Sequence, residues 1–271
     1  MTIPPGRSGR TPAWQVRPGS VGNRPVRLLV AGSVTDQPEV VLLPGLGAPG
    51  YLAPWADRIG HWTRATVLDL PGWRWGRATA CRPTLAGVSE VVAQWLTEQD
   101  RRNVVLVGHS TGAQAVLRAA LLVPDRLAGL VLAGPTFDPA ARTVGRLLRR
   151  APRTLLHERP AELPAVLPSY LHGGLGVLRF LLDALPDRPE ERIGQLRVPV
   201  LVMTGQRDGF APPAWARQLA ELAGGRCVVL PGAHNACFPY PDLATGALRE
   251  AVLAWRPPTP AAEAAGAGTT T

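Results

Sequence analysis

The sequence contains no lysine, so all 29 of its basic residues are arginine, against 20 acidic residues and a formal net charge of +9. A surplus of this size can indicate a nucleic-acid or membrane-surface partner. An arginine-only set in a chain rich in alanine, glycine and proline instead favours a coding bias towards GC-rich codons. Because no helix-turn-helix, zinc-finger or aromatic-platform pattern accompanies the charge, we expect no nucleic-acid partner.

Cysteine and long apolar runs are also scarce. Cys81, Cys227 and Cys237 allow at most one disulfide, and their spacing does not match a metal site. No stretch of about 18 uncharged apolar residues occurs, and the first ten residues lead into no apolar run. We therefore expect no metal, no cofactor, no transmembrane segment and no signal peptide, and a cytoplasmic protein.

Short apolar runs are what the chain has in abundance, and hydrophobic residues make up 46% of its 271 residues. That length can bury a sizeable single core. Runs rich in β-formers alternate with stretches of helical spacing, which predicts an α/β fold with a mainly parallel, doubly wound sheet. The predicted strands are 26–30, 40–43, 66–68, 104–107, 130–132, 200–203 and 227–230.

The alternation is interrupted once. Between residues 136 and 197 there are amphipathic segments and prolines but no strand, and a structureless loop of that length is uncommon in a compact domain. We predict that these residues form a helical lid, or cap, inserted after the sixth strand into a core of residues 21–135 and 198–256. Residues 1–20 and 257–271 are predicted to be disordered.

A glycine-flanked serine stands where a predicted strand gives way to a predicted helix. The motif is Gly108-His109-Ser110-Thr111-Gly112, a G-x-S-x-G pattern. Small flanking residues permit a sharp, strained turn that exposes the Ser110 hydroxyl at the carboxyl end of the sheet. The Thr111 N–H then lies at a helix start, where it can donate to an oxyanion. The alternative is that Ser110 simply caps the helix.

From about residue 26 to residue 255 the chain resembles the α/β-hydrolase fold superfamily, in particular its serine hydrolases with a helical lid. The family order of nucleophile, acid and histidine implies Asp208, which follows the strand at 200–203, and His234, which follows the last strand. Asp138 is the alternative acid, because some members place it after the preceding strand.

The resemblance also implies a second oxyanion donor, the backbone N–H of Leu46, in the loop after the strand at 40–43. Pro44 stands in this loop where many relatives have histidine. His109, beside the serine, is expected to serve packing or hydrogen bonding. Trp73 and Trp75 either wall an acyl pocket or cover the edge of the sheet.

The implied function is hydrolysis of an ester, thioester, lactone or related activated carbonyl through an acyl-enzyme. Ser110 is the nucleophile, His234 the general base and Asp208 the group that orients the imidazole. The partner is a small acyl substrate. Carbon–carbon bond hydrolysis, acyl transfer or perhydrolysis on the same triad, and non-catalytic binding of a small ligand, stay open as alternatives.

One local charge feature falls within the predicted lid. Of five arginines at helical spacing, most are expected to share one helix face, opposite Val144, Leu147 and Leu148. This stripe is either a solvated face or a site that attracts an anionic substrate, an acyl-carrier protein or a membrane surface. Its members are Arg142, Arg146, Arg149, Arg150 and Arg153.

Overall fold

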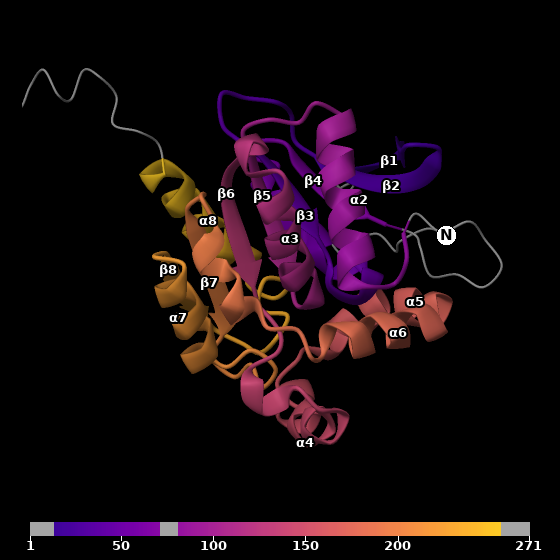
Figure 1. Cartoon of the computed structure of the whole chain (residues 1–271), viewed down its shortest axis with the longest axis vertical. Helices are drawn as coiled ribbons and strands as arrows, with labels where there is room; N and C mark the ends of the chain where they lie inside the picture. The colour runs from indigo at the N-terminus through magenta and orange to yellow at the C-terminus, as the bar shows by residue number, and fades with distance from the viewer. Residues whose placement is uncertain (1–13, 71–80, 256–271) are drawn as a thin grey trace, which may run out of the picture.

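A mostly parallel sheet forms the centre of the computed structural model, which describes residues 14–70 and 81–255 (Figure 1). Its strands lie in the order β1-β2-β4-β3-β5-β6-β7-β8; β1 and β2 are antiparallel to their neighbours and the other strands are parallel. The strands are β1 Trp14–Val21, β2 Arg24–Ala31, β3 Glu39–Leu43, β4 Ala65–Asp69, β5 Val104–His109, β6 Leu127–Ala133, β7 Val200–Gly205 and β8 Arg226–Leu230.

Helices cover both faces of the sheet, so the predicted doubly wound α/β fold is confirmed. Side chains of α2, α3 and α7 pack on one face and those of α1 and α8 on the other. Successive side chains of β5 enter opposite cores: Val104 and Leu106 belong to the first and Val105 and Val107 to the second. The helices are α1 Ala53–Ile59, α2 Leu85–Glu98, α3 Thr111–Leu122, α7 Pro213–Leu222 and α8 Pro241–Ala254.

Strand β1 corrects the sequence prediction, which assigned residues 1–20 to a disordered segment. It pairs with β2 along its whole length, from Trp14 opposite Ala31 to Val21 opposite Arg24. Most of its side chains are exposed and it contains Pro18 and Gly19, so it lacks the apolar run by which the other strands were predicted. Residues 1–13 and 257–271 lie outside the described residues.

Three helices lie between β6 and β7, in the part of the chain where the sequence predicts a helical insertion. The arrows of β6 and β7 point towards the end of the molecule where these helices lie (Figure 1). Several short 3-10 turns join the elements. The helices are α4 Val144–Leu155, α5 Leu163–Gly173 and α6 Leu175–Ala184; the 3-10 turns are Gly45–Gly47, Pro49–Leu52, Pro124–Arg126, Pro139–Ala141, Pro160–Glu162, Pro189–Glu191 and Ile193–Gln195.

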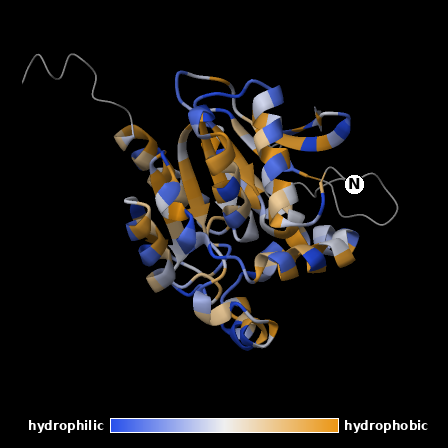
Figure 2. Ribbon diagram, in the orientation of Figure 1, coloured by the Kyte–Doolittle hydropathy of each residue, from blue (hydrophilic) through white to orange (hydrophobic). Residues whose placement is uncertain are grey.

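The hydropathy of the elements follows this layering. The central strands are almost wholly apolar, whereas α4, α5 and α6 mix apolar and polar residues (Figure 2). None of the helices in the described ranges is both long and apolar enough to cross a bilayer by itself. One adjacent pair, Pro160–Gly173 and Leu175–Ala184, meets both conditions together, across a bend of 98°.

Candidate active site

Ser110 occupies a strained turn between β5 and α3. Its φ of 58° and ψ of −127° lie in a region that non-glycine residues rarely adopt. The turn also needs its glycines, since a Cβ on Gly112 would come within 2.6 Å of the carbonyl oxygen of Leu43 and a Cβ on Gly108 would overlap Val116. The Ser110 side chain makes no capping hydrogen bond, so the helix-cap interpretation is wrong.

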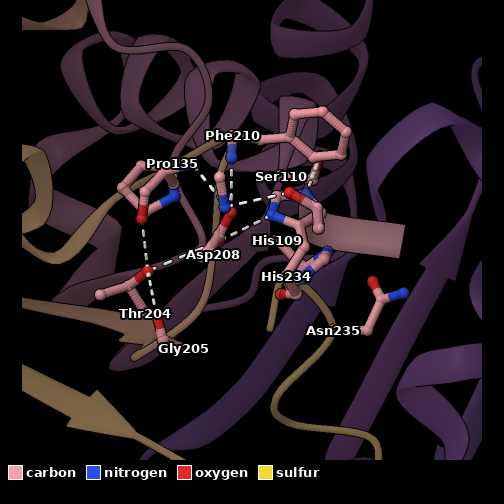
Figure 3. Close-up of polar contacts among 12 residues, drawn as sticks. His109, Ser110, Pro135, Thr204, Gly205, Asp208, Phe210, His234 and Asn235 are labelled. Atoms are coloured by element: carbon pink, nitrogen blue, oxygen red, sulfur yellow. Dashed lines mark hydrogen bonds and ion pairs between the residues drawn. The ribbon is translucent and has the colours of Figure 1, made fainter. Parts of the chain in front are cut away.

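A continuous chain of hydrogen bonds joins Ser110, His234 and Asp208 (Figure 3). His234 Nε2 lies 2.8 Å from Ser110 Oγ, and His234 Nδ1 lies 2.8 Å from Asp208 Oδ2. The three residues come from the carboxyl end of β5 and from the loops that follow β7 and β8. The second Asp208 oxygen accepts the N–H groups of Phe210 and Ala211, at 2.8 and 2.9 Å.

The electrostatics of this chain favour an ionised acid beside the histidine. Burial raises the pKa of Asp208, but the neighbouring His234 and the donated N–H groups outweigh it, so the pKa lies below its ordinary value. Burial lowers the pKa of His234, but the negative charge of Asp208, and next those of Glu158 and Glu162, raise it by more. The pKa of His234 therefore lies above its ordinary value of 6.5. An ionised Asp208 accepts from Nδ1–H and leaves Nε2 as the acceptor facing Ser110.

Asp138, the alternative acid, does not contact His234. Its Oδ2 accepts Arg150 Nη1 at 2.5 Å instead. The chain passes His234 at Gly134, whose φ is +52° and where a Cβ would lie 3.2 Å from the imidazole. By residue 138 the chain has turned towards α4, so the loop after β7 supplies the acid that meets the histidine.

The two backbone groups named as oxyanion donors lie beside Ser110. Thr111 is the first residue of α3, where an N–H has no partner within the helix. The Leu46 loop lies against the serine, because a Cβ on Gly45 would come within 2.6 Å of Ser110 Cβ. The Leu46 N–H donates to Thr111 Oγ1 at 3.1 Å, a bond that the sequence did not predict.

His109 links two loops of the site, in line with its expected hydrogen-bonding role. Its Nε2 lies 2.9 Å from the carbonyl oxygen of His234 and its Nδ1 2.9 Å from the Tyr51 hydroxyl, which accepts the Gly45 N–H at 2.6 Å. Burial, followed by the charge of His234, lowers the pKa of His109 to about 3, so the ring is neutral near pH 7. A carbonyl can only accept, so Nε2 carries the proton and Nδ1 accepts from Tyr51.

Two carboxylates from the segment between β6 and β7 hold the residue after His234. Glu158 Oε1 accepts the Asn235 backbone N–H at 3.0 Å, and Glu162 Oε2 accepts the Asn235 side-chain amide at 2.8 Å. Burial, and next the charge of Glu162, raise the pKa of Glu158 to about 7. Neither glutamate was singled out from the sequence, because nothing local to them indicates a contact with residue 235.

Three of the five arginines of the predicted stripe are exposed at helical spacing on α4, and the other two are held in ion pairs. Arg142 makes a bidentate pair with Glu190, both N–O distances being 2.7 Å, and Arg150 pairs with Asp138. The buried Asp138 and the half-buried Glu190 draw these two guanidinium groups inward. The exposed members are Arg146, Arg149 and Arg153.

Other predicted features give no further site. Trp73 and Trp75 lie outside the described residues. Cys227 and Cys237 are free thiols, and Cys81 is buried. Within residues 14–70 and 81–255, no group of three or more histidine, cysteine or acidic side chains is arranged to hold a metal ion.

The fold and the strand-end site define a class, and the chain belongs to the alpha/beta hydrolase family, whose model matches residues 40–247. One relative, a monoacylglycerol lipase of Mycolicibacterium smegmatis, is 26% identical over 225 residues, which cover 72% of this chain and 75% of the relative. The mouse protein ABHD8 is 26% identical over 254 residues, covering 81% of this chain but only 56% of the relative. Relatives of this kind support a hydrolase.

Solved structures agree on the fold. A thermophilic esterase from Thermogutta terrifontis superposes with a TM-score of 0.69 at 19% identity, covering 90% of this chain and all of the esterase. Identity at this level establishes the shared architecture and not the substrate.

Proposed function

We propose that the protein is a serine hydrolase that cleaves a small ester, thioester, lactone or related activated carbonyl through an acyl-enzyme. The observation that carries this proposal is the hydrogen-bond chain Ser110–His234–Asp208, closed at 2.8 Å on both sides of the imidazole. Its members occupy the carboxyl ends of parallel strands, where open α/β sheets bind their ligands.

The geometry supports a stepwise proton transfer. Ser110 Oγ attacks the carbonyl carbon while its proton moves to His234 Nε2, which gives a tetrahedral oxyanion and an imidazolium. Asp208 holds the ring in place and stabilises its positive charge. His234 then returns the proton to the leaving-group atom as the carbon–heteroatom bond breaks. Water, activated by the same nitrogen, hydrolyses the acyl-enzyme and restores the serine.

The oxyanion is assigned to backbone donors. The Thr111 N–H lies at the start of α3, where the helix dipole also favours negative charge. The Leu46 N–H becomes a second donor when an oxyanion replaces Thr111 Oγ1 as its acceptor. Removing one such donor typically costs about 10²- to 10³-fold in rate.

A series of p-nitrophenyl esters of increasing acyl length, run beside a thioester and a lactone, tests the proposal. The wild type is expected to hydrolyse at least one class, and Ser110→Ala is expected to lose about 10⁶-fold in kcat. Ser33→Ala, in an exposed loop, is the matched control and should retain full activity. A folded wild type inactive on every class, or an equally active Ser110→Ala variant, would favour a non-catalytic binding protein on this fold.

A further inference from the structure

Exposed apolar side chains gather in the segment between β6 and β7. Ten of the seventeen large apolar residues that are exposed in the described part of the chain fall within residues 144–182. We call this set the α4–α6 surface. Its members are Val144, Leu148, Leu155, Leu156, Leu163, Leu167, Leu171, Leu175, Leu178 and Leu182.

The leucines of α5 follow the helical repeat on the side turned to solvent. Leu163, Leu167 and Leu171 are four residues apart, which places them on one helix face, and Leu171 is 73% exposed. Val166 and Tyr170, on another side of the helix, pack against the core that contains α1 and α8. A surface helix normally turns a single apolar stripe to the core, so the solvent-facing stripe of α5 is an additional one.

Helix α6 repeats this arrangement. Leu175, Leu178 and Leu182 are three and four residues apart and are exposed, whereas Phe180 and Ala184 are buried in the other core. The second apolar stripe therefore recurs on two consecutive helices, which meet at a bend of 98°. Scattered single leucines on a surface need no explanation, but a repeated stripe marks an interaction surface.

The charges around these leucines are mostly positive. Residues 144–184, which end with α6, contain six arginines and three acids; Glu158 and Glu162 are engaged with Asn235, and Asp183 accepts the Leu85 N–H at 2.7 Å. Glu162 is buried and Glu158 half-buried, so neither balances the exposed positive charge. The arginines exposed within this stretch are Arg146, Arg149, Arg153, Arg159 and Arg179.

Leucine stripes on α5 and α6 together with exposed arginines on α4 match the chemistry of an anionic bilayer surface. Leucine side chains enter the boundary between headgroups and acyl chains, while guanidinium groups pair with lipid phosphates. A lipid surface can cover apolar side chains on several differently oriented helices without a complementary shape. An acidic protein would satisfy the arginines but would need a matching apolar face as well.

The position of the surface connects it to the candidate active site. Helix α5 lies directly on the 3-10 turn Pro49–Leu52, because a Cβ on Gly50 would come within 2.6 Å of the Ala165 carbonyl oxygen. That turn follows the loop of Gly45 and Leu46, which lies against Ser110. A membrane beneath α4–α6 would therefore lie at the end of the molecule towards which β6 and β7 point (Figure 1), and Ser110 directly follows the parallel strand β5.

We propose that the α4–α6 surface docks the protein on an anionic lipid bilayer, with leucines of α5 and α6 in the headgroup boundary and arginines of α4 on lipid phosphates. This goes beyond the proposed hydrolysis and does not depend on it. Ser110→Ala is expected to bind vesicles as the wild type does. Vesicle binding can therefore be measured and interpreted even if the catalytic proposal fails.

Sedimentation with vesicles tests the docking on the full chain. Binding is expected to be strong with a phosphatidylglycerol–phosphatidylcholine mixture, weak with phosphatidylcholine alone, and reduced by added salt. The triple variant Arg146→Gln, Arg149→Gln, Arg153→Gln should lose about a hundredfold in partitioning. The triple variant Leu167→Ser, Leu171→Ser, Leu178→Ser should lose at least about tenfold.

Matched controls change the same residue types on other surfaces. Arg102→Gln, Arg188→Gln, Arg217→Gln removes equal charge, and Leu122→Ser, Leu243→Ser, Leu253→Ser removes equally exposed leucines. Both controls should bind like the wild type, and thermal unfolding confirms that each variant is folded. The docking proposal is overturned if the wild type ignores anionic vesicles at low salt, if the controls lose as much as the α4–α6 variants, or if only an acidic protein is bound.

Discussion

The strands that end beneath the candidate triad and the segment between β6 and β7 place their apolar side chains in opposite ways. Every residue of β5 and β7 is buried, and each strand is paired on both sides. Residues 144–182, which include most of α4 to α6, instead leave ten large apolar side chains exposed. The difference shows that the first region holds the site rigidly through packing, whereas the second depends on a few specific contacts.

Those contacts reach the residues that directly follow the acid and the histidine. The Gly209 N–H, next to Asp208, donates to Thr154 Oγ1 of α4 at 3.0 Å. Asn235, next to His234, is held by Glu158 and Glu162. The segment between β6 and β7 is therefore coupled to the site through the loops after β7 and β8.

Exchanging the acid in each region gives the largest expected contrast. Asp208→Asn should lower kcat by about 10⁴-fold, because an amide can still accept from Phe210 and Ala211 but no longer orients and stabilises a protonated His234. Asp138→Asn, which loses only its ion pair with Arg150, should change kcat by less than about tenfold. Steady-state ester hydrolysis measures both, and a larger loss in Asp138→Asn would reverse the assignment of the acid.

Leucine truncation compares the packing of the two regions. Leu106→Ala, at a fully buried position in β5, should lower the free energy of unfolding by about 2–5 kcal/mol through lost burial and a cavity. Leu171→Ala, on the exposed stripe of α5, should change it by no more than about 0.5 kcal/mol. Denaturant unfolding reports both values, and a comparable loss in the two variants would mean that α5 is packed against another part of the protein.

Breaking the link between the regions should have an intermediate effect. Asn235→Ala removes a donor from the buried Glu162 carboxylate, and we expect a loss of about 1–3 kcal/mol in the free energy of unfolding. The kcat of this variant should fall while a surface control, Gln218→Ala, keeps wild-type values. If Asn235→Ala matches the control in both measurements, the contact does not position the histidine loop.

The pH profile should show the smallest effect. The proposed base must be unprotonated, and the pKa of His234 lies above 6.5, so kcat/KM should rise with pH through a midpoint above 6.5. Glu158 is among the groups that raise this pKa, so Glu158→Gln should move the midpoint downward. An unchanged or higher midpoint in Glu158→Gln would show that its charge does not reach the imidazole.

The sequence predicted features that local patterns encode. Short apolar runs located seven of the eight strands in the described residues, and the G-x-S-x-G motif indicated Ser110. The order of nucleophile, acid and histidine that the family resemblance implies then pointed to Asp208 and His234. Strand β1 was not predicted, because an exposed edge strand has no continuous apolar run. It is the pairing with β2, a tertiary contact, that stabilises it.

Contacts between distant segments could not be predicted in this way. His109 meets Tyr51 and His234 across 58 and 125 residues, and Asn235 meets Glu162 across 73. Neither periodicity nor spacing in the sequence predicts such contacts, because the residues next to each partner show no distinctive pattern. The inward turn of Arg142 and Arg150 was missed for the same reason, since their carboxylate partners lie on other segments or turns.

Labelling with a fluorophosphonate, followed by intact-protein and peptide mass spectrometry, tests whether Ser110 is an activated nucleophile, because the reagent reacts with activated serines whatever the natural substrate. We expect one adduct per wild-type chain, located on Ser110, and none in a folded Ser110→Ala variant. An unlabelled, correctly folded wild type, or equal labelling of Ser110→Ala, would contradict this expectation.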